Sequence, residues 1–449
     1  MSEDIIDKLI AGTLPDPDGN GMLRVATRAV AIARGLRGNE AELVAPLQLG
    51  RHFAVVSDAT THALLGCSVE PALASLGKVT SIVLPERPHA GADNVELIRK
   101  ESATADALVA VGSGTINDLC KYASARDGKP YVVFATAPSM NGYTSLNAAI
   151  TVNGHKKSLT AQAPLGVFVD LGIMVAAPAR MIRSGLGDSL CRPTAQADWL
   201  LASLLFDRPY RTMPFALLAA EEPALFAEAE ALMAGDLAAM TCLVRTLLLS
   251  GFGTAICGNS QPASQGEHLI SHYADMLGDA AWPHAFHGEQ IGVTTLTMAR
   301  LQERLLDGRP PVVRTNGLDE WAFVARYGEE LGRSCWAEFQ QKRLNTARAR
   351  AVNSRIAARW DDICSTIAQV TRPAQFLADV LRRAGAPSRP EELGWPRDFY
   401  RRAVRHAREI RNRYTFLDLA VDSDRLEPID ALIPSNGMDS APAQRQSSR

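Results

Sequence analysis

Four short apolar runs in the first third of the chain alternate with stretches of helical spacing. They are residues 52–57 (HFAVVS), 80–85 (TSIVLP), 107–112 (ALVAVG) and 131–136 (YVVFAT). Short runs rich in β-branched residues, each followed by a helical pattern, are typical of βαβ units. When helices cover both faces of such a sheet, its strands are apolar on both sides. The pattern therefore predicts an α/β domain with a parallel sheet.

Further patterns extend this domain. Residues 1–45 have apolar positions at helical spacing on both sides of a turn rich in Pro, Gly and Asp, and they predict two amphipathic helices. Residues 148–152 and 156–160 flank Asn153-Gly154, a strong hairpin-turn signal, and they predict a β-hairpin. Residues 166–170 (GVFVD) predict a strand that returns the chain to the sheet.

Beyond these strands the chain is rich in Ala, Leu, Glu and Arg at helical spacing, for example over residues 216–232 and 237–249. We therefore predict an N-terminal α/β domain over residues 1–178 and an all-helical C-terminal domain over residues 179–432. The polar composition of residues 433–449 predicts a disordered tail.

Composition narrows the class of protein. The 47 Lys and Arg residues nearly balance the 49 Asp and Glu residues, which argues against nucleic acid as the main partner. Seven scattered cysteines without a CxxC pair are typical of a reduced, cytoplasmic protein. The N-terminus is acidic, unlike a signal peptide. No apolar run approaches the roughly 18 residues that span a membrane, since Arg245 interrupts the best candidate, near Leu247.

Four of the nine histidines, His268, His272, His284 and His287, lie close together in the sequence. His268 and His272 are four residues apart, so on a helix both rings point to one side. Gly278 and Pro283 break the helical pattern, and this allows the chain to fold back. Imidazoles that meet across a helix–turn–helix are typical of a metal site, whereas each histidine alone is equally compatible with the surface or a helix cap.

A catalytic metal usually takes three protein ligands and keeps one position open. Asp188 is our candidate for the missing anionic ligand, because it lies in the expected first helix of the second domain. A helix N-cap is its alternative role.

The third apolar run ends in Gly112-Ser113-Gly114, directly before a predicted helix. Glycines allow close approach of the backbone, and the amides of a helix start attract phosphate, so this turn is a candidate pyrophosphate site. It departs from GxGxxG, and an ordinary tight turn is the alternative. The loop after the fourth run, residues 136–145 (TAPSMNGYTS), places hydroxyl and amide groups at the same expected sheet edge, where ligands of open α/β sheets bind.

Together these segments resemble the iron-containing (group III) alcohol dehydrogenase superfamily, and within it the glycerol-1-phosphate dehydrogenase branch. The resemblance runs from about residue 20 to residue 422. It is carried by residues 112–121 (GSGTINDLCK), 136–139 (TAPS), 187–188 (GD), 267–272 (EHLISH), 287–289 (HGE) and 410–418 (IRNRYTFLD).

The resemblance implies a Rossmann-like dinucleotide-binding domain, an all-helical domain and one divalent metal in the cleft between them. By position it implies that Asp188, His268 and His287 are the metal ligands, so the pair His268 and His272 does not chelate together. Asp188 and His272 are the expected catalytic residues, and with Asn141 they are expected to contact the substrate. The expected cofactor-binding residues are Asp58, Gly112, Ser113, Gly114, Thr115, Ile116, Thr136, Ser139 and Ser145.

The implied activity is NAD- or NADP-linked oxidation of a short-chain polyol or polyol phosphate, foremost sn-glycerol 1-phosphate to dihydroxyacetone phosphate, with zinc, nickel or iron. Asp58 favours NAD, since an acidic residue there binds the ribose hydroxyls. Asn141 stands where the family has Asp, which leaves the substrate open. The alternatives are a lyase or cyclase like dehydroquinate synthase, which has Glu at the position of Asp188, and a non-catalytic NAD(P)-binding relative. We expect a homodimer or larger homo-oligomer. Candidate phosphate partners are Lys156, Lys157, Arg183 and Arg192.

Overall fold

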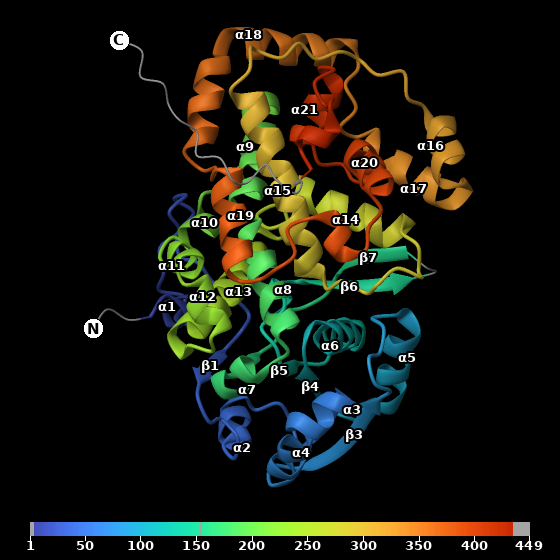
Figure 1. The fold of residues 1–449 in the computed structure, drawn as a ribbon. Helices are drawn as coiled ribbons and strands as arrows, with labels where there is room; N and C mark the ends of the chain where they lie inside the picture. The colour runs from blue at the N-terminus through green and yellow to red at the C-terminus, as the bar shows by residue number, and fades with distance from the viewer. Residues whose placement is uncertain (1–3, 153–154, 434–449) are drawn as a thin grey trace.

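The protein is represented by a computed structural model that describes residues 4–152 and 155–433. Figure 1 shows two parts, a parallel sheet with its helices in the lower half and a larger set of helices above it. The predicted hairpin turn, Asn153-Gly154, and residues 434–449 of the predicted tail lie outside the described residues. Ile433, which we assigned to the tail, is buried in the helical core.

The lower part is built on a six-stranded sheet in which all neighbouring strands are parallel, with the order β1-β8-β5-β4-β2-β3. The four apolar runs and residues 166–170 are confirmed as strands of this sheet. The strands are β1 (Ala29–Ala33), β2 (His52–Asp58), β3 (Lys78–Leu84), β4 (Ala107–Gly112), β5 (Tyr131–Ala135) and β8 (Gly166–Asp170). The predicted hairpin is confirmed as β6 (Asn147–Val152) and β7 (His155–Thr160), which pair antiparallel.

Helices cover both faces of the sheet, which explains its continuous apolar strands. Val55 and Val109 belong to one face and pack with α4 (Cys67–Ala74). Their neighbours Val56 and Ala110 point to the other face. They pack there with α5 (Ala92–Glu101) and α6 (Gly114–Asp127).

Strand β1 corrects one prediction. Residues 29–33 (AVAIA) form an edge strand paired with β8, where we expected the second amphipathic helix. Of the two expected helices only α1 (Ile5–Ala11) is confirmed, and α2 (Glu40–Val44) is a short helix beyond the strand. Alternating Ala, Val and Ile fit either pattern, so pairing with a distant strand decides the conformation.

The order of the strands has a topological switch point between β2 and β4. From β2 the chain passes outward to β3 and then returns to β4 on the opposite side of β2. Ligands of open α/β sheets bind at such a switch point, beyond the carboxyl ends of the strands. The register pairs Val56 with Ala110, so Asp58 and Gly112 lie at the same level where β2 and β4 end.

Among the described residues after β8 the chain forms helices and no strands, as predicted. The predicted helix over residues 216–232 is divided into three short helices, because the chain bends near residues 217–220 and at Glu228. The helices are α7 (Leu171–Ala176), α8 (Ala179–Leu190), α9 (Arg192–Phe206), α10 (Met213–Ala216), α11 (Glu221–Ala227), α12 (Ala229–Met233), α13 (Leu237–Cys257), α14 (Gly266–Leu277), α15 (His287–Leu306), α16 (Glu320–Tyr327), α17 (Glu329–Phe339), α18 (Thr346–Ala368), α19 (Ala374–Arg383), α20 (Arg397–His406) and α21 (Phe416–Asp422).

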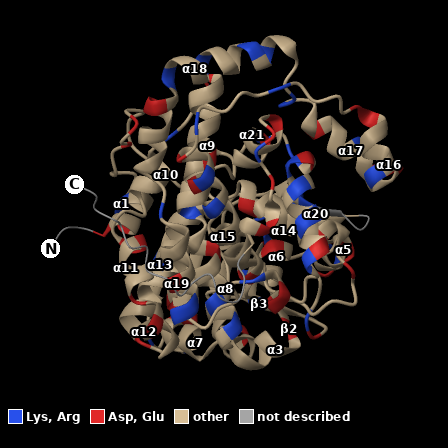
Figure 2. Ribbon diagram, turned by 45° about the horizontal axis from the view of Figure 1, so that its top comes forward, with Lys and Arg blue, Asp and Glu red and all other residues tan. Residues whose placement is uncertain are grey.

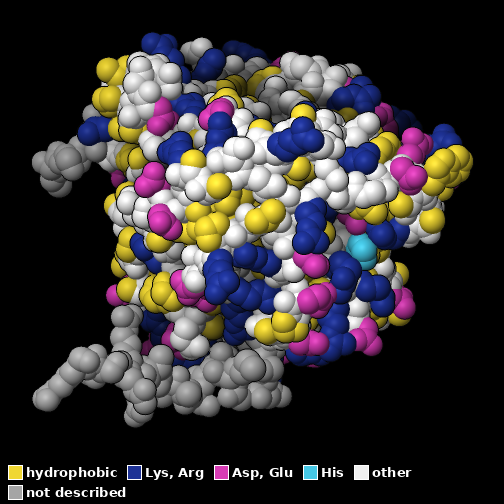
Figure 3. Space-filling view, turned by 90° about the horizontal axis from the view of Figure 1, so that it is seen from above, with side chains coloured by type: hydrophobic (Ala, Val, Ile, Leu, Met, Phe, Trp, Pro, Cys, Tyr) yellow, Lys and Arg dark blue, Asp and Glu magenta, His cyan; other side chains and the backbone are white. Residues whose placement is uncertain are grey.

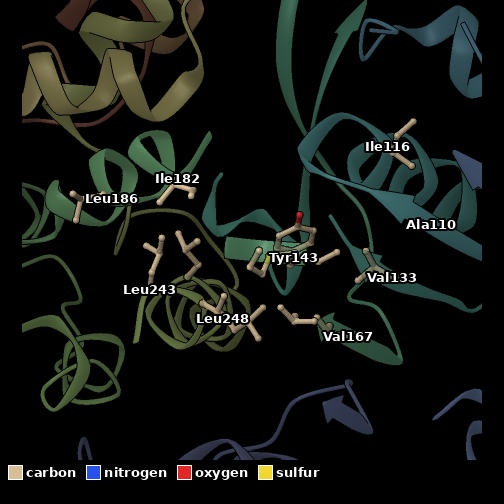
Figure 4. Close-up of a cluster of buried hydrophobic side chains, with 14 of the residues drawn as sticks. Ala110, Ile116, Val133, Tyr143, Val167, Ile182, Leu186, Leu243 and Leu248 are labelled. Carbon is tan, nitrogen blue, oxygen red and sulfur yellow. The ribbon is translucent and has the colours of Figure 1, made fainter. Parts of the chain in front are cut away.

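Helix α13 joins the two parts. Figure 4 shows its Leu243 and Leu248 between α8 and the sheet, where they meet Ile182, Leu186 and Tyr143. By length and composition α13 could cross a membrane, which our sequence prediction denied, but 67% of its most apolar window is buried inside the structure. A core helix passes the same test.

Charged residues of both signs are spread over the two parts of the molecule (Figure 2). On the face seen in Figure 3, groups of basic side chains have acidic side chains beside them. Helix α20 illustrates this mixing, because its Arg401 and Arg405 form ion pairs with Asp430 and Glu427. The near-zero formal charge therefore reflects signs that alternate over the surface.

Helices α8 and α15 touch through their backbones. A Cβ added at Gly187 would come within 3.0 Å of the Gly288 carbonyl oxygen, and one at Gly288 would similarly meet the Ser184 carbonyl. Ser184 Oγ accepts a hydrogen bond from Gly288 N (3.0 Å) and donates one to Ser139 O (2.9 Å). Helix α8 is thus fixed to both α15 and the loop that follows β5.

We expect Gly187→Ala to lower the free energy of unfolding by about 1–3 kcal/mol, because the added methyl group forces α8 and α15 apart. Chemical denaturation followed by circular dichroism measures this loss. The matched control is Gly292→Ala on α15, whose methyl group would lie 3.2 Å from the flexible end of Leu381. Equal stability of the two variants would contradict the close contact.

Candidate metal centre and cofactor crevice

Asp188, His268 and His287 come together from three helices, α8, α14 and α15. Asp188 Oδ1 lies 3.8 Å from His268 Nε2 and 3.9 Å from His287 Nε2. One potential ligand atom of each residue lies within 4.8 Å of the others. The structure therefore brings together the three residues that the resemblance implied as metal ligands.

The carboxylate of Asp188 is buried in the last turn of α8, with 1% of the residue exposed, so it is not a helix N-cap. Its Oδ2 accepts a hydrogen bond from the Asn141 backbone N–H (2.9 Å). Its Oδ1 faces the imidazoles and accepts no hydrogen bond from any described residue. Burial raises the pKa of the Asp188 carboxyl, against the opposing effect of His268. A buried oxygen of this kind is suited to a cation.

His268 is oriented by its neighbour in the sequence. Glu267 is fully buried, and its Oε1 lies 2.9 Å from His268 Nδ1. A carboxylate at Nδ1 favours the tautomer that carries its proton on Nδ1. The lone pair of Nε2, on the side of Asp188, is then available to a metal ion. The same Oε1 accepts a hydrogen bond from Gln265 N (2.8 Å) at the start of α14.

Two imidazoles and one carboxylate form a donor set that suits zinc, iron or nickel. Ligand atoms around tetrahedral zinc lie about 3.3 Å apart, given bonds of about 2.0–2.1 Å. The distances of 3.8 and 3.9 Å from Asp188 Oδ1 need only a small inward movement to match. Cys191, Glu267 and His268 form a second close group, but burial raises the pKa of the Cys191 thiol well above its usual value and keeps it protonated. The residues at the first group therefore fit a divalent ion.

His272 lies one helical turn beyond His268. Its ring centre is 5.9 Å from that of His268 and 6.3 Å from that of His287. The half-buried ring is thus beside the three converging residues, outside the group of three. His284, the fourth histidine of the sequence cluster, is exposed and packs near Phe286 (5.4 Å).

The glycine turn after β4 leads directly into α6. Ser113 is the N-cap residue, and its side chain makes no capping hydrogen bond. The first amides of α6 are therefore not capped by this side chain, which suits a phosphate ligand. The fold itself also requires a glycine at position 112, because a Cβ there would come within 3.0 Å of the Ile116 side chain. Thr115 and Ile116 belong to the first turn of α6.

The other predicted cofactor residues follow β2 and β5. Asp58 ends β2, and its Oδ1 accepts a hydrogen bond from Thr61 N (2.8 Å) as the N-cap of α3 (Ala59–Thr61). Thr136 and Ser139 are buried in the segment after β5. Ser145 Oγ lies 3.2 Å from Lys121 Nζ. These positions belong to the loops at the carboxyl edge of the sheet or directly beyond them.

Lys121 is a site residue to which we gave no role from the sequence. Its buried ammonium group donates to the carbonyls of Gly142 and Asn147 (3.1 Å for Asn147) and to Ser145 Oγ. Burial lowers the pKa of Lys121, while Asp118 at 3.7 Å opposes that shift. The spacing of Asp118 and Lys121 on one helix was visible in the sequence, but the distant carbonyls were not.

Asn141 is connected to a second buried cation. Its Nδ2 donates to Ser250 Oγ (3.2 Å), and Arg192 Nη1 donates to the same oxygen (2.8 Å). Arg192 is buried, and burial lowers its pKa. Among the other phosphate candidates, Arg183 donates to Ala384 O (3.0 Å), between α8 and α19, and Lys157 is exposed on β7. The side chain of Lys156 lies outside the described residues.

The fold combines a parallel sheet that has a topological switch point with helices that carry three residues able to hold a metal ion. This combination is typical of enzymes that bind a nucleotide and a metal. The family model for iron-containing alcohol dehydrogenase matches residues 31–178. A glycerol-1-phosphate dehydrogenase of the NAD(P)+ type from Bacillus subtilis (strain 168) is 30% identical over 385 residues, which cover 84% of this chain and 86% of the relative. The chain belongs to the iron-containing alcohol dehydrogenase family, in its glycerol-1-phosphate dehydrogenase branch.

Two further comparisons agree with this assignment. A glycerol-1-phosphate dehydrogenase from Pyrococcus furiosus is 34% identical over 274 residues, which cover 61% of this chain and 78% of the relative. The crystal structure of a probable glycerol dehydrogenase from Sinorhizobium meliloti 1021 superposes with a TM-score of 0.58 at 17% identity, and it covers 90% of this chain and 97% of that chain. The structural likeness concerns the fold.

We expect Lys121→Met to lower the free energy of unfolding by about 3–5 kcal/mol, because it leaves buried acceptors without their donor. The variant should also raise the dissociation constant of NADH, since the loop from Gly142 to Asn147 loses its anchor. Chemical denaturation and fluorescence titration of NADH measure the two effects.

The matched control is Lys129→Met. Lys129 Nζ also donates to two carbonyls, those of Ser102 and Ala103, but it lies beyond the far end of α6. It should cost stability and leave the affinity for NADH unchanged. A Lys121→Met protein that binds NADH as tightly as this control would refute the anchoring role.

Proposed function

We propose that this protein is a metal-dependent, NAD(P)-linked dehydrogenase that interconverts sn-glycerol 1-phosphate and dihydroxyacetone phosphate. The observation that carries the proposal is the convergence of Asp188, His268 and His287 in a protein whose sheet has a topological switch point between β2 and β4. The names of the Bacillus subtilis and Pyrococcus furiosus relatives support the substrate and the cofactor class.

In this proposal Asp188, His268 and His287 hold one divalent ion, with zinc first and nickel or iron as alternatives. A bound ion supplies Lewis-acid polarisation of the substrate oxygen, and a bound nicotinamide supplies the hydride chemistry. Glu267 keeps His268 in the tautomer that presents Nε2. The Asn141 backbone N–H holds Asp188 in place. In this proposal the side-chain amide of Asn141 contacts the substrate. His272 orients the substrate or carries the proton.

The switch point between β2 and β4 supports dinucleotide binding by Asp58, residues 112–116, Thr136, Ser139 and Ser145. Asp58 favours NAD, and we propose that NADP is also accepted, as in the names of the relatives. We further propose that residues 1–178 and 179–432 act as two domains around the cleft, and that the enzyme works in the cytoplasm as a homodimer or larger homo-oligomer.

A substrate screen tests the function. The purified protein should reduce NAD+ or NADP+ with glycerol 1-phosphate, lose this activity after chelation, and regain it with zinc, nickel or iron. Absorbance at 340 nm follows the reaction. Net NADH formation separates a dehydrogenase from a cyclase, which regenerates its NAD+. Binding of NADH without turnover of any polyol or polyol phosphate would instead indicate a non-catalytic relative and overturn the proposal.

Metal analysis tests the individual residues. Asp188→Ala, His268→Ala and His287→Ala should each reduce the bound metal to a small fraction of the wild-type content, because each removes one of three ligands. His272→Ala should keep its metal and lose turnover by about 10²–10⁴-fold, the usual range for an acid–base group. Elemental analysis of the four purified proteins measures the metal. A full complement of metal in His287→Ala would contradict the ligand assignment.

A further inference from the structure

A guanidinium group lies at the loop that leads into the metal-binding helix. Arg413 follows the short helical turn Ala407–Ile410 and precedes α21. It donates to Ser264 O and to Ser260 Oγ (2.7 Å for Ser260), both in the loop between α13 and α14. That loop continues directly into Glu267 and His268. Arg413 is therefore bound to the segment that positions one of the proposed metal ligands.

A second set of contacts connects the same loop to Asp188. The thiol of Cys191, one turn after Asp188, donates to Asp188 O (3.1 Å) and lies 3.8 Å from Ala263 O. Ala263 is adjacent in sequence to Ser264, which accepts from Arg413. The backbone of the loop between α13 and α14 therefore accepts hydrogen bonds from Arg413, at Ser264 O, and from Cys191, which follows Asp188 by three residues.

The charge of Arg413 is not balanced by the residues around it. The group is half-buried, and burial together with the like charge of Arg411 lowers its pKa to about 10, so it remains charged at neutral pH. Glu267 and Glu338 oppose this shift, but within residues 4–152 and 155–433 no carboxylate lies at ion-pair distance from Arg413 or Arg411.

The more deeply buried cations of the same region, Lys342 and Arg408, form ion pairs with carboxylates. Lys342 lies 2.9 Å from Asp418, and Arg408 lies 2.8 Å from Asp422. Buried cations normally have such partners, because an unpaired buried charge is costly. Among the described residues, this half-buried guanidinium has two hydrogen-bond acceptors for its five N–H groups. Such an arrangement next to a site is expected where an anionic ligand supplies the partner.

Hydrogen bonds hold the backbone around Arg413. Lys342 Nζ donates to Arg413 O (2.6 Å) and thereby holds its backbone. Asp198 accepts hydrogen bonds from Phe416 N (2.8 Å) and from Gly266 N (2.9 Å), so it ties the start of α21 to the start of α14. These hydrogen bonds connect the backbone near Arg413 to the start of the helix that carries His268.

We propose that Arg413, supported by the neighbouring charge of Arg411, binds the phosphate group of the substrate. This inference rests on the proposed function and deepens it, since it explains why the enzyme would select a polyol phosphate over a free polyol. The fork of a guanidinium matches two phosphate oxygens, which an ammonium group on the same backbone could not do equally well.

The test compares glycerol 1-phosphate with glycerol in the metal-loaded enzyme and in its Arg413→Gln and Arg413→Lys variants. For Arg413→Gln the ratio of kcat/KM for the phosphate ester to that for glycerol should fall about 10²-fold, as expected for lost hydrogen bonds to a charged group. Arg413→Lys should recover part of this ratio, because it keeps the charge and loses the fork. Inorganic phosphate should inhibit the wild type and inhibit Arg413→Gln much less.

The matched control is Arg405→Gln, which removes a surface arginine that pairs with Glu427 and should leave the ratio unchanged. Metal content and melting temperature separate a binding role from a structural one. An equal loss for both substrates in both Arg413 variants, with lower metal content, would overturn the proposal.

Failure of the function itself has a different signature. If the wild type does not oxidise glycerol 1-phosphate, the proposed substrate is wrong, and calorimetric titration of inorganic phosphate into the metal-loaded protein still tests the site. Equal affinity of wild type and Arg413→Gln for phosphate in that titration would overturn the inference. Weaker binding to the variant would support it independently of the substrate.

Discussion

The contact between α8 and α15 is the constraint on which the site depends. No side chain separates the two helices where Gly187 meets Gly288, so Asp188 and His287, the residues next to these glycines, face a common space. Ser184 extends the same contact to the loop after β5, through hydrogen bonds to Ser139 O and from Gly288 N. One helix therefore fixes both the metal-type cluster and a loop at the edge of the sheet, and side-chain bulk at Gly187 or Gly288 would disturb both at once.

Strong local signals in the sequence predicted the strands correctly. Each of the four apolar runs is flanked by a helical pattern. All four are strands, and they lie next to one another in the sheet in the order β5-β4-β2-β3. Asp188 was assigned to the first helix of the second domain, and it lies in α8, the first helix after residue 178. The four-residue spacing of His268 and His272 predicted that both rings lie on one side of a helix. It could not show which of the two rings faces Asp188. That choice depends on the position of α15, which no local pattern encodes.

What could not be predicted depends on contacts between distant segments. Strand β1 has a composition that suits a helix equally well, and only the pairing of Ala29 to Ala33 with β8 makes it a strand. Gly112 was interpreted as a phosphate-binding glycine, yet its closest constraint is the side chain of Ile116 in the following helix. Lys121 and Arg413 were both inside the motifs that we recognised. Their acceptors lie in loops far away in the sequence, so their roles became visible only in three dimensions.

The distribution of buried charge gives a further argument for a cation at the cluster. Asp188, Glu267 and Asp198 are three buried carboxylates, and burial raises the pKa of Asp188 and Asp198, with Glu267 adding to both shifts. The desolvation cost of a buried carboxylate is offset where a cation or hydrogen-bond donors stabilise its charge. Backbone N–H groups satisfy Asp198 completely, one for each oxygen. Asp188 has one such donor, at Oδ2, and its Oδ1 is directed at two imidazoles without a hydrogen bond from the described residues. A cation bound there would stabilise the negative charge of this carboxylate.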